Sequence, residues 1–124
     1  MRRLLCFAAL LGLAAGTAAA GEADVLAAEA KALDGGRYRF DVTVRHADEG
    51  WQHYADRWEV LAPDGTVLAT RVLRHPHVDD QPFTRSLPAV AIPEGTRRVT
   101  VRAHDSVHGL GGAELTIELP ARKE

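Results

Sequence analysis

The chain has 124 residues, a formal net charge of −2 and a single cysteine, and 46% of its residues are hydrophobic. This length is enough for one domain with one core. The mildly acidic balance argues against a protein that binds nucleic acid or an anionic membrane surface.

The first twenty residues have the pattern of a secretory signal peptide. A basic start, Met1-Arg2-Arg3, precedes an apolar run over residues 4–15, and Ala18-Ala19-Ala20 offers the small residues that a signal peptidase reads. The run is shorter than the roughly 20 apolar residues of a membrane-spanning helix. We therefore expect cleavage after Ala20 and a domain over residues 21–124 with no stable membrane insertion. Cys6 precedes most of the apolar run, which argues against a lipoprotein.

Removal of this segment would change the charge and the chemistry of the chain. It takes away Arg2 and Arg3, so the net charge moves from −2 to −4, and it takes away Met1 and Cys6, the sole methionine and the sole cysteine. The remaining domain would have neither a disulfide nor a sulfur ligand. We interpret this as a periplasmic or secreted bacterial protein, not as a disulfide-rich eukaryotic module.

Residues 23–33 allow two interpretations. Their alanines favour a helix by propensity, and Asp34-Gly35-Gly36 is able to end one. The same tripeptide also suits a hairpin turn. Because every later segment has strand character, we favour a first strand here and leave the helix open.

The residues that follow predict strands separated by short turns. Tyr38, Phe40, Val42 and Val44 alternate with polar residues, which is the period of a strand with one buried face. Turns are expected at residues 63–66 and 93–96, where proline precedes an acid and glycine. The predicted strands are residues 37–46, 54–61, 67–74, 83–92, 99–103 and 115–119. Pro88 should bend residues 83–92 or confine them to a sheet edge.

About seven strands without a helical interlude predict an all-β domain, a single antiparallel β-sandwich. The segments Pro93-Glu94-Gly95-Thr96 and Val99-Thr100-Val101-Arg102-Ala103, with Asp105 and the glycine-rich loop to Leu115, resemble the last strands of fibronectin type III and immunoglobulin-like domains. This resemblance covers about a third of the chain and implies the same two-sheet fold. The chain departs from the pattern of these domains at Arg98, where an aromatic residue would be expected, and it lacks the cysteine pair of immunoglobulins.

The middle of the chain has a second resemblance. The segments Arg45-His46-Ala47-Asp48, Tyr54-Ala55-Asp56-Arg57-Trp58, His75-Pro76-His77 and Gln81-Pro82-Phe83-Thr84 resemble small exported bacterial proteins of unassigned function. The resemblance implies export and no particular activity.

Strand order predicts that all six histidines meet at one end of the sandwich. Successive strands reverse direction, so the loops after residues 46, 74 and 103 should share one end, and the three tight turns should share the other. Those loops hold the histidines, and the turns hold none. The histidines are His46, His53, His75, His77, His104 and His108.

Metal binding is one interpretation of this end. Imidazole suits Zn(II), Cu(II) and Ni(II), and residues i and i+2 of an extended chain project to the same side. We expect His75, His77 and His108 as ligands, with His46 or His104 completing the set. Carboxylates would bind directly or orient a ring, as Asp105, Asp56, Asp79 and Asp80 are placed to do. No cofactor is certain, and Zn(II) or Cu(II) is the candidate.

A non-enzymatic binding module is the favoured interpretation. Aromatic residues and arginine anchor interfaces, and loops at one end of a sandwich commonly carry recognition. The partner would be an unknown periplasmic protein or a small ligand. No nucleophile elbow, phosphate-binding loop or His-Glu-x-x-His motif occurs, so an enzyme is disfavoured, with a metal-dependent hydrolase as the least favoured alternative. The predicted binding residues are Trp51, His53, Tyr54, Asp56, Asp79, Phe83 and Arg85.

Overall fold

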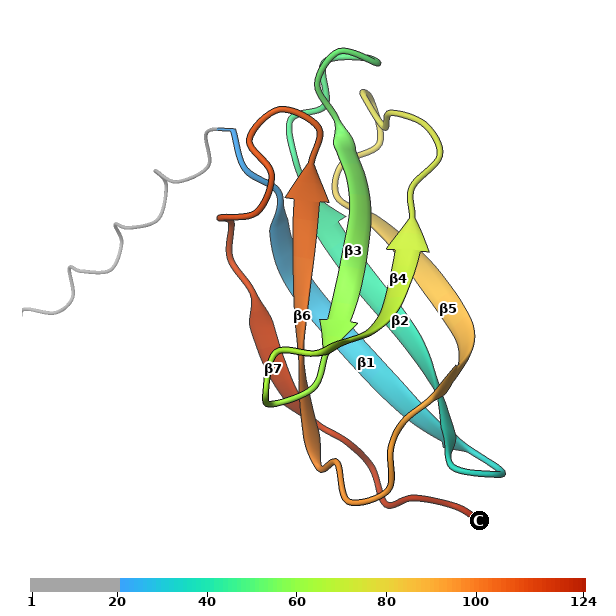
Figure 1. Cartoon of the computed structure of the whole chain (residues 1–124). Helices are drawn as coiled ribbons and strands as arrows, with labels where there is room; N and C mark the ends of the chain where they lie inside the picture. Colours follow the sequence, from blue (N-terminus) through green and yellow to red (C-terminus); the bar gives the residue numbers. More distant parts are fainter. Residues whose placement is uncertain (1–20) are drawn as a thin grey trace, which may run out of the picture.

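A computed structural model describes residues 21–124, which form two antiparallel sheets packed face to face (Figure 1). The first sheet has the order β1-β2-β5 and the second has the order β4-β3-β6-β7. The predicted all-β sandwich of seven strands is therefore confirmed. The predicted signal peptide lies outside the described residues. Within residues 21–124 no helix is long and apolar enough to cross a membrane.

The strand bounds agree with the predicted segments to within a few residues. Residues 24–33 form a strand, which decides between the two interpretations of that segment. The strands are β1 (Asp24–Leu33), β2 (Arg37–Arg45), β3 (Ala55–Leu61), β4 (Val67–Val72), β5 (Phe83–Ala91), β6 (Arg98–Asp105) and β7 (Leu115–Glu118).

Pro88 acts as the sequence predicts. It lies in β5, which is an edge strand of its sheet, and the register of β5 against β2 shifts between Tyr38 and Phe40, opposite Val90 and Leu87. A proline has no N–H for a ladder hydrogen bond, so an edge position with a register shift accommodates it.

The core lies between the sheets and comes from the alternating residues of the central strands. Phe40, Val42 and Val44 of β2 face Trp58 and Val60 of β3, and all five are fully buried. Each such side chain contributes about 1.5–3 kcal/mol of transfer free energy relative to an exposed position. This core fixes the positions of the strand ends, and thereby those of the loops.

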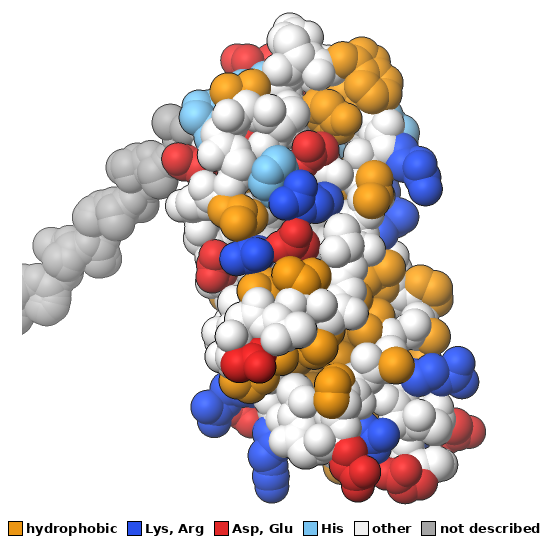
Figure 2. All heavy atoms as spheres, in the orientation of Figure 1, with side chains coloured by type: hydrophobic (Ala, Val, Ile, Leu, Met, Phe, Trp, Pro, Cys, Tyr) orange, Lys and Arg blue, Asp and Glu red, His pale blue; other side chains and the backbone are white. Residues whose placement is uncertain are grey.

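Three loops extend from the same end of the sandwich, namely those between β2 and β3, β4 and β5, and β6 and β7 (Figure 1). The chain enters β1 at that end as well, beside the β6–β7 loop. On the face that Figure 2 presents, histidine side chains gather in the upper half, and the lower end carries acids and cationic side chains.

Replacing Phe40 by alanine should lower the free energy of unfolding by about 3–5 kcal/mol, because a fully buried ring leaves a cavity between the two sheets. Denaturant unfolding followed by circular dichroism measures this change. Val67→Ala is the matched control, since Val67 is exposed and should cost less than about 0.5 kcal/mol. Equal losses in the two variants would contradict this location of the core.

Candidate metal centre

Asp105 is the centre of the histidine-bearing end. It is the last residue of β6, where strand alternation turns its side chain inward, and it is fully buried. Its Oδ1 accepts hydrogen bonds from the backbone N–H groups of Val107, His108 and Gly109. Its Oδ2 faces three imidazole rings. The carboxylate thus closes the β6–β7 loop with one oxygen and presents the other to the histidines.

The first of these rings belongs to His46, which directly follows β2 and is buried. Its Nε2 lies 2.8 Å from Asp105 Oδ2, and its Nδ1 lies 2.6 Å from Asp48 Oδ1. Asp48 is itself fixed, because Oδ1 accepts from the Ala55 N–H and Oδ2 accepts from the His77 N–H. His46 is therefore held rigidly between two buried carboxylates.

His53, from the loop between β2 and β3, repeats this arrangement closer to the surface. Its Nε2 lies 2.9 Å from Asp105 Oδ2, and its Nδ1 lies 3.0 Å from Glu49 Oε1. A third ring, that of His108, places Nδ1 3.1 Å from the same Oδ2. The His108 side chain is 41% exposed, so this side of the cluster opens to solvent.

The electrostatics of the cluster follow from these contacts. Burial opposes ionisation of Asp105, but hydrogen bonds from the His108 N–H and from the imidazoles of His53, His108 and His46 outweigh it. Together they hold the pKa of Asp105 well below its ordinary value. Asp105 and then Glu49 raise the pKa of His53 above its ordinary value. Asp105 is thus an anion at neutral pH, as a metal ligand has to be.

His46, His53 and Asp105 form a possible metal-binding group. One ligand atom from each residue is available, and these atoms all lie within 4.8 Å of one another. Two members, His46 and Asp105, belong to the ligand set predicted from sequence. His53 had been predicted as a binding residue instead. The metal roles of His46 and Asp105 and the binding role of His53 stay predictions.

Of the other predicted ligands, His108 contacts Asp105 Oδ2, whereas His104, His75 and His77 lie away from this group. His104 is the neighbour of Asp105 on β6, so alternation turns it to the opposite face, where its Nδ1 lies 2.7 Å from Asp56 Oδ1. His75 and His77 lie on the β4–β5 loop, with ring centroids 4.8 Å apart. The His77 ring stacks on Phe83 at 3.9 Å and accepts a hydrogen bond from Arg85 through Nε2.

The remaining predicted binding residues lie on the same loops or at the adjoining ends of β3 and β5. Trp51 is 66% exposed and packs edge-on against Tyr54, with centroids 5.6 Å apart. Asp79 is exposed on the β4–β5 loop. Phe83 is buried in the core beneath His77, so it supports that ring and offers little surface to a partner.

Three residues of the site were missing from the sequence prediction. Asp48 and Glu49 orient the two histidines, and Gly21 places its carbonyl oxygen 3.0 Å from His46 Nε2. The spacing His46-x-Asp48 was a signal for the first contact, since residues i and i+2 of an extended chain share a side. No local pattern marks Gly21, which reaches the site from the start of the described chain.

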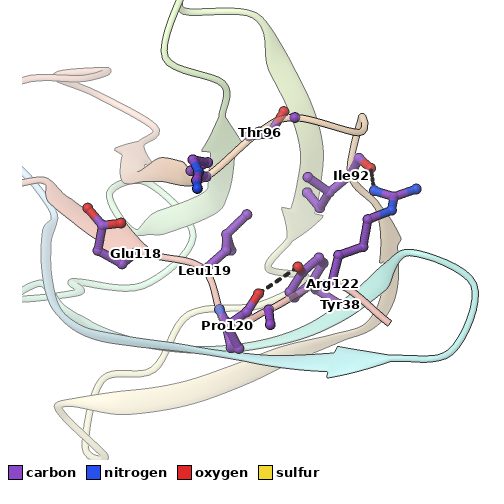
Figure 3. Close-up of a pocket in the computed structure, with 10 residues that line it drawn as sticks. Tyr38, Ile92, Thr96, Glu118, Leu119, Pro120 and Arg122 are labelled. Atoms are coloured by element: carbon purple, nitrogen blue, oxygen red, sulfur yellow. Dashed lines mark hydrogen bonds between the residues drawn. The ribbon is translucent and has the colours of Figure 1, made fainter. Parts of the chain in front are cut away.

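A cavity of about 390 Å³ lies at the opposite end of the molecule (Figure 3). Two of its polar side chains have backbone partners. The Tyr38 hydroxyl donates to the Pro120 carbonyl, and Arg122 donates to the Ile92 carbonyl, both at 2.8 Å. These contacts attach the C-terminal segment to the sandwich.

Comparison with known proteins finds a putative lipoprotein of the archaeon Halomicrobium mukohataei, which is 40% identical over 97 residues. The matched region covers 78% of this chain and 47% of that relative, so the chain spans about half the relative's length. No protein-family model matches the chain, and no solved structure matches it. The resemblance to fibronectin type III and immunoglobulin-like domains stays a prediction beyond the confirmed sandwich.

Replacing Asp48 by alanine should lower the free energy of unfolding by about 3–5 kcal/mol, because the donors of His46, Ala55 and His77 lose their buried acceptor. Thermal and denaturant unfolding measure the loss. Asp79→Ala is the control, since Asp79 is exposed and should change stability by less than about 0.5 kcal/mol. A stable Asp48→Ala protein would mean that this carboxylate does not organise the loops.

Proposed function

We propose that this domain is an exported binding protein for a divalent transition metal, Zn(II) or Cu(II), with His46, His53 and Asp105 as ligands. One observation carries the proposal. Each histidine has Nδ1 on an outer carboxylate, and each directs Nε2 at the same Asp105 oxygen. Ligating histidines are held in this way in metalloproteins, where an outer carboxylate accepts the Nδ1 hydrogen and leaves the Nε2 lone pair for the ion.

The hydrogen count supports a cation between these groups. A neutral imidazole has one N–H. With that hydrogen on Nδ1, where Asp48 and Glu49 accept it, the contacts of His46 Nε2 and His53 Nε2 with Asp105 Oδ2 need a second proton on each ring, as in the hydrogen bonds of the metal-free cluster, or a metal ion. Facing acceptors repel unless further protons or a metal ion lie between them. A divalent ion satisfies the two nitrogens and the carboxylate at once.

The dimensions and donor types of the group fit such an ion. Metal–ligand bonds of about 2.0–2.2 Å place tetrahedral ligand atoms about 3.4 Å apart. Nε2 of His46 and of His53 now lie 2.8 and 2.9 Å from Asp105 Oδ2, so ion binding requires each of these contacts to open by about half an ångström. All donors are nitrogen or oxygen, and residues 21–124 contain neither cysteine nor methionine. This set suits Zn(II) or Cu(II) and disfavours Cu(I).

An exported location is part of the proposal. It is supported by the basic and apolar pattern of residues 1–20 and by the description of the archaeal relative as a putative lipoprotein. Since that relative comes from an archaeon, we propose export in general and not a bacterial periplasm in particular.

Partner binding through the same end is the second candidate function. Trp51 is the most exposed of the large hydrophobic side chains in the described chain, and Tyr54 supports its ring. Exposed tryptophan is enriched among residues that anchor interfaces. The two functions are compatible, because Trp51 is outside the proposed ligand set.

Replacing His46 or His53 by alanine should weaken the binding of Zn(II) and Cu(II) at least 100-fold, because each change removes one of three ligands. Isothermal titration of the chelator-treated protein measures the affinities.

The control is the double variant His75→Ala/His77→Ala, which keeps the proposed ligands and should keep the affinity. Binding that depends on His75 and His77 instead, or wild-type affinity no tighter than about 1 mM, would refute the site. Circular dichroism verifies folding, and His53, being closer to the surface than His46, is the safer variant.

Replacing Glu49 by glutamine should weaken metal binding about 10–100-fold without destabilising the fold, because a neutral amide orients the His53 ring less strongly than a carboxylate. The Glu49 side chain is 64% exposed, so folding should be unaffected. Glu94→Gln, at the opposite end, serves as the control. Equal affinities in the two variants would exclude Glu49 as the group that orients His53.

A further inference from the structure

A second polar cluster lies between the open edges of the two sheets. Strand β4 ends one sheet and β5 ends the other, and the two strands are in contact. A pocket of about 190 Å³ opens beside them, lined by the end of β4, the start of the β4–β5 loop and Arg85. Three of its side chains are arginines and two are the histidines of His75-Pro76-His77, which the proposed metal centre does not use. The arginines are Arg71, Arg74 and Arg85.

Strand register explains why two of these arginines point toward the inside of the sandwich. Arg71 pairs with Trp58 across β4 and β3, and Arg85 pairs with Val42 across β5 and β2. Directly paired residues project to the same face of a sheet. Trp58 and Val42 are fully buried, so both guanidinium groups are on inward faces, one from each sheet.

The pocket has an excess of positive charge. Among residues 21–124, its lining contains no aspartate or glutamate, and none of its three arginines forms an ion pair. Arg85 instead donates to the Thr84 carbonyl and to His77 Nε2, the latter at 2.8 Å. By contrast, Arg39, Arg57, Arg98 and Arg102 all pair with carboxylates elsewhere on the sheets.

Two residues that line this pocket each have a buried donor atom without a partner in the described chain. A guanidinium only donates, so His77 Nε2 accepts from Arg85 and the ring hydrogen is on Nδ1. His77 is 3% exposed, and its Nδ1 has no hydrogen-bond partner within the described residues; the same holds for the buried Nε of Arg71. Each unmet buried donor costs about 1–3 kcal/mol. An acceptor in the pocket would remove that cost.

We propose that this pocket binds a small phosphate-type oxyanion, held by the guanidinium groups of Arg71 and Arg85 with His77 Nδ1–H as a neutral donor. A guanidinium group can donate two parallel hydrogen bonds to two oxygens of one phosphate. The three arginines of the pocket lining favour a dianion over a singly charged carboxylate. The volume admits inorganic phosphate or the phosphate group of a larger molecule that extends into solvent. This proposal is independent of the proposed metal function.

Inward charges on edge strands also keep a sheet from adding a further strand. That role would account for Arg71 and Arg85, but it gives no reason for an unpartnered donor on His77. The two explanations differ in one measurable property, because edge protection alone requires no affinity for phosphate.

The test is a titration of the metal-free, chelator-treated full chain with inorganic phosphate at constant ionic strength, followed by nuclear magnetic resonance. We expect saturable binding tighter than about 10 mM, with shifts confined to residues 71–77 and 83–85. Arg71→Gln and Arg85→Gln should each weaken it about tenfold or more, which is the effect of a lost charged hydrogen bond. The matched control, Arg98→Gln, removes an outward arginine of β6 and should change nothing.

Several outcomes would overturn the proposal. Phosphate binding that does not saturate would do so, as would an equal loss of phosphate affinity in Arg98→Gln. Acetate that binds as tightly as phosphate would also contradict it. Self-association of the Arg71→Gln and Arg85→Gln proteins, with no phosphate affinity in the wild type, would favour edge protection instead. If Arg85→Gln does not fold, Arg85→Lys keeps the charge without the paired donors. It should then bind phosphate more weakly than wild type, and unchanged binding would count against the site. A phosphorylated small molecule that binds more tightly than inorganic phosphate would show that the pocket holds the phosphate group of a larger ligand.

Discussion

The buried carboxylate of Asp105 is the constraint on which the histidine-bearing end depends. One oxygen accepts hydrogen bonds from three backbone N–H groups and so determines the path of the β6–β7 loop. The other faces His46, His53 and His108, which come from two different loops. A buried anion is stable only with compensating partners, because desolvation costs several kcal/mol. The need to satisfy this charge therefore draws separate loops together.

Asp48 has the corresponding role on the other side of His46. It lies outside any strand, and its two oxygens accept from the His46 ring and from the backbone of Ala55 and His77. In this way one carboxylate fixes the orientation of a proposed ligand, the start of β3 and the β4–β5 loop. The rigid sandwich supplies the strand ends, and the two aspartates determine how the loops between those ends meet.

Much of the fold was predictable from residue alternation, because a buried face at every second position is visible in the chain itself. The strand formed by residues 24–33 required the context of its neighbours, since alanine-rich sequence is compatible with helix and strand alike. The side on which each histidine falls was harder to predict. His104 and Asp105 are adjacent, yet they face opposite sides of β6, so one joins Asp56 and the other joins the buried cluster.

The predicted ligand set starts from proximity in the sequence. His75-Pro76-His77 is the densest histidine motif, but the His77 ring is held by Phe83 and Arg85 on the edge strand β5, and the His75 ring packs against that of His77. The contacts that distinguish His46 and His53 come from Asp48, Glu49, Asp105 and Gly21. Of these, Asp105 and Gly21 are far from the two histidines in sequence and are brought to them by the pairing of β3 with β6 and of β1 with β2. Such pairings determine a site, and a single sequence does not give their geometry.

The two proposed sites have opposite charge and are connected through one residue. Asp48 contacts the His46 ring of the acidic centre through Oδ1, and it accepts the backbone N–H of His77, whose ring lines the cationic pocket, through Oδ2. A displacement of the β4–β5 loop by an anion would therefore act on the carboxylate that orients His46. Because coupling between two binding equilibria is reciprocal, an anion that altered metal affinity would have its own affinity altered by the metal by the same factor. Both effects would depend on the Asp48 carboxylate, which joins the two loops through a hydrogen bond of 2.6 Å and another of 2.7 Å.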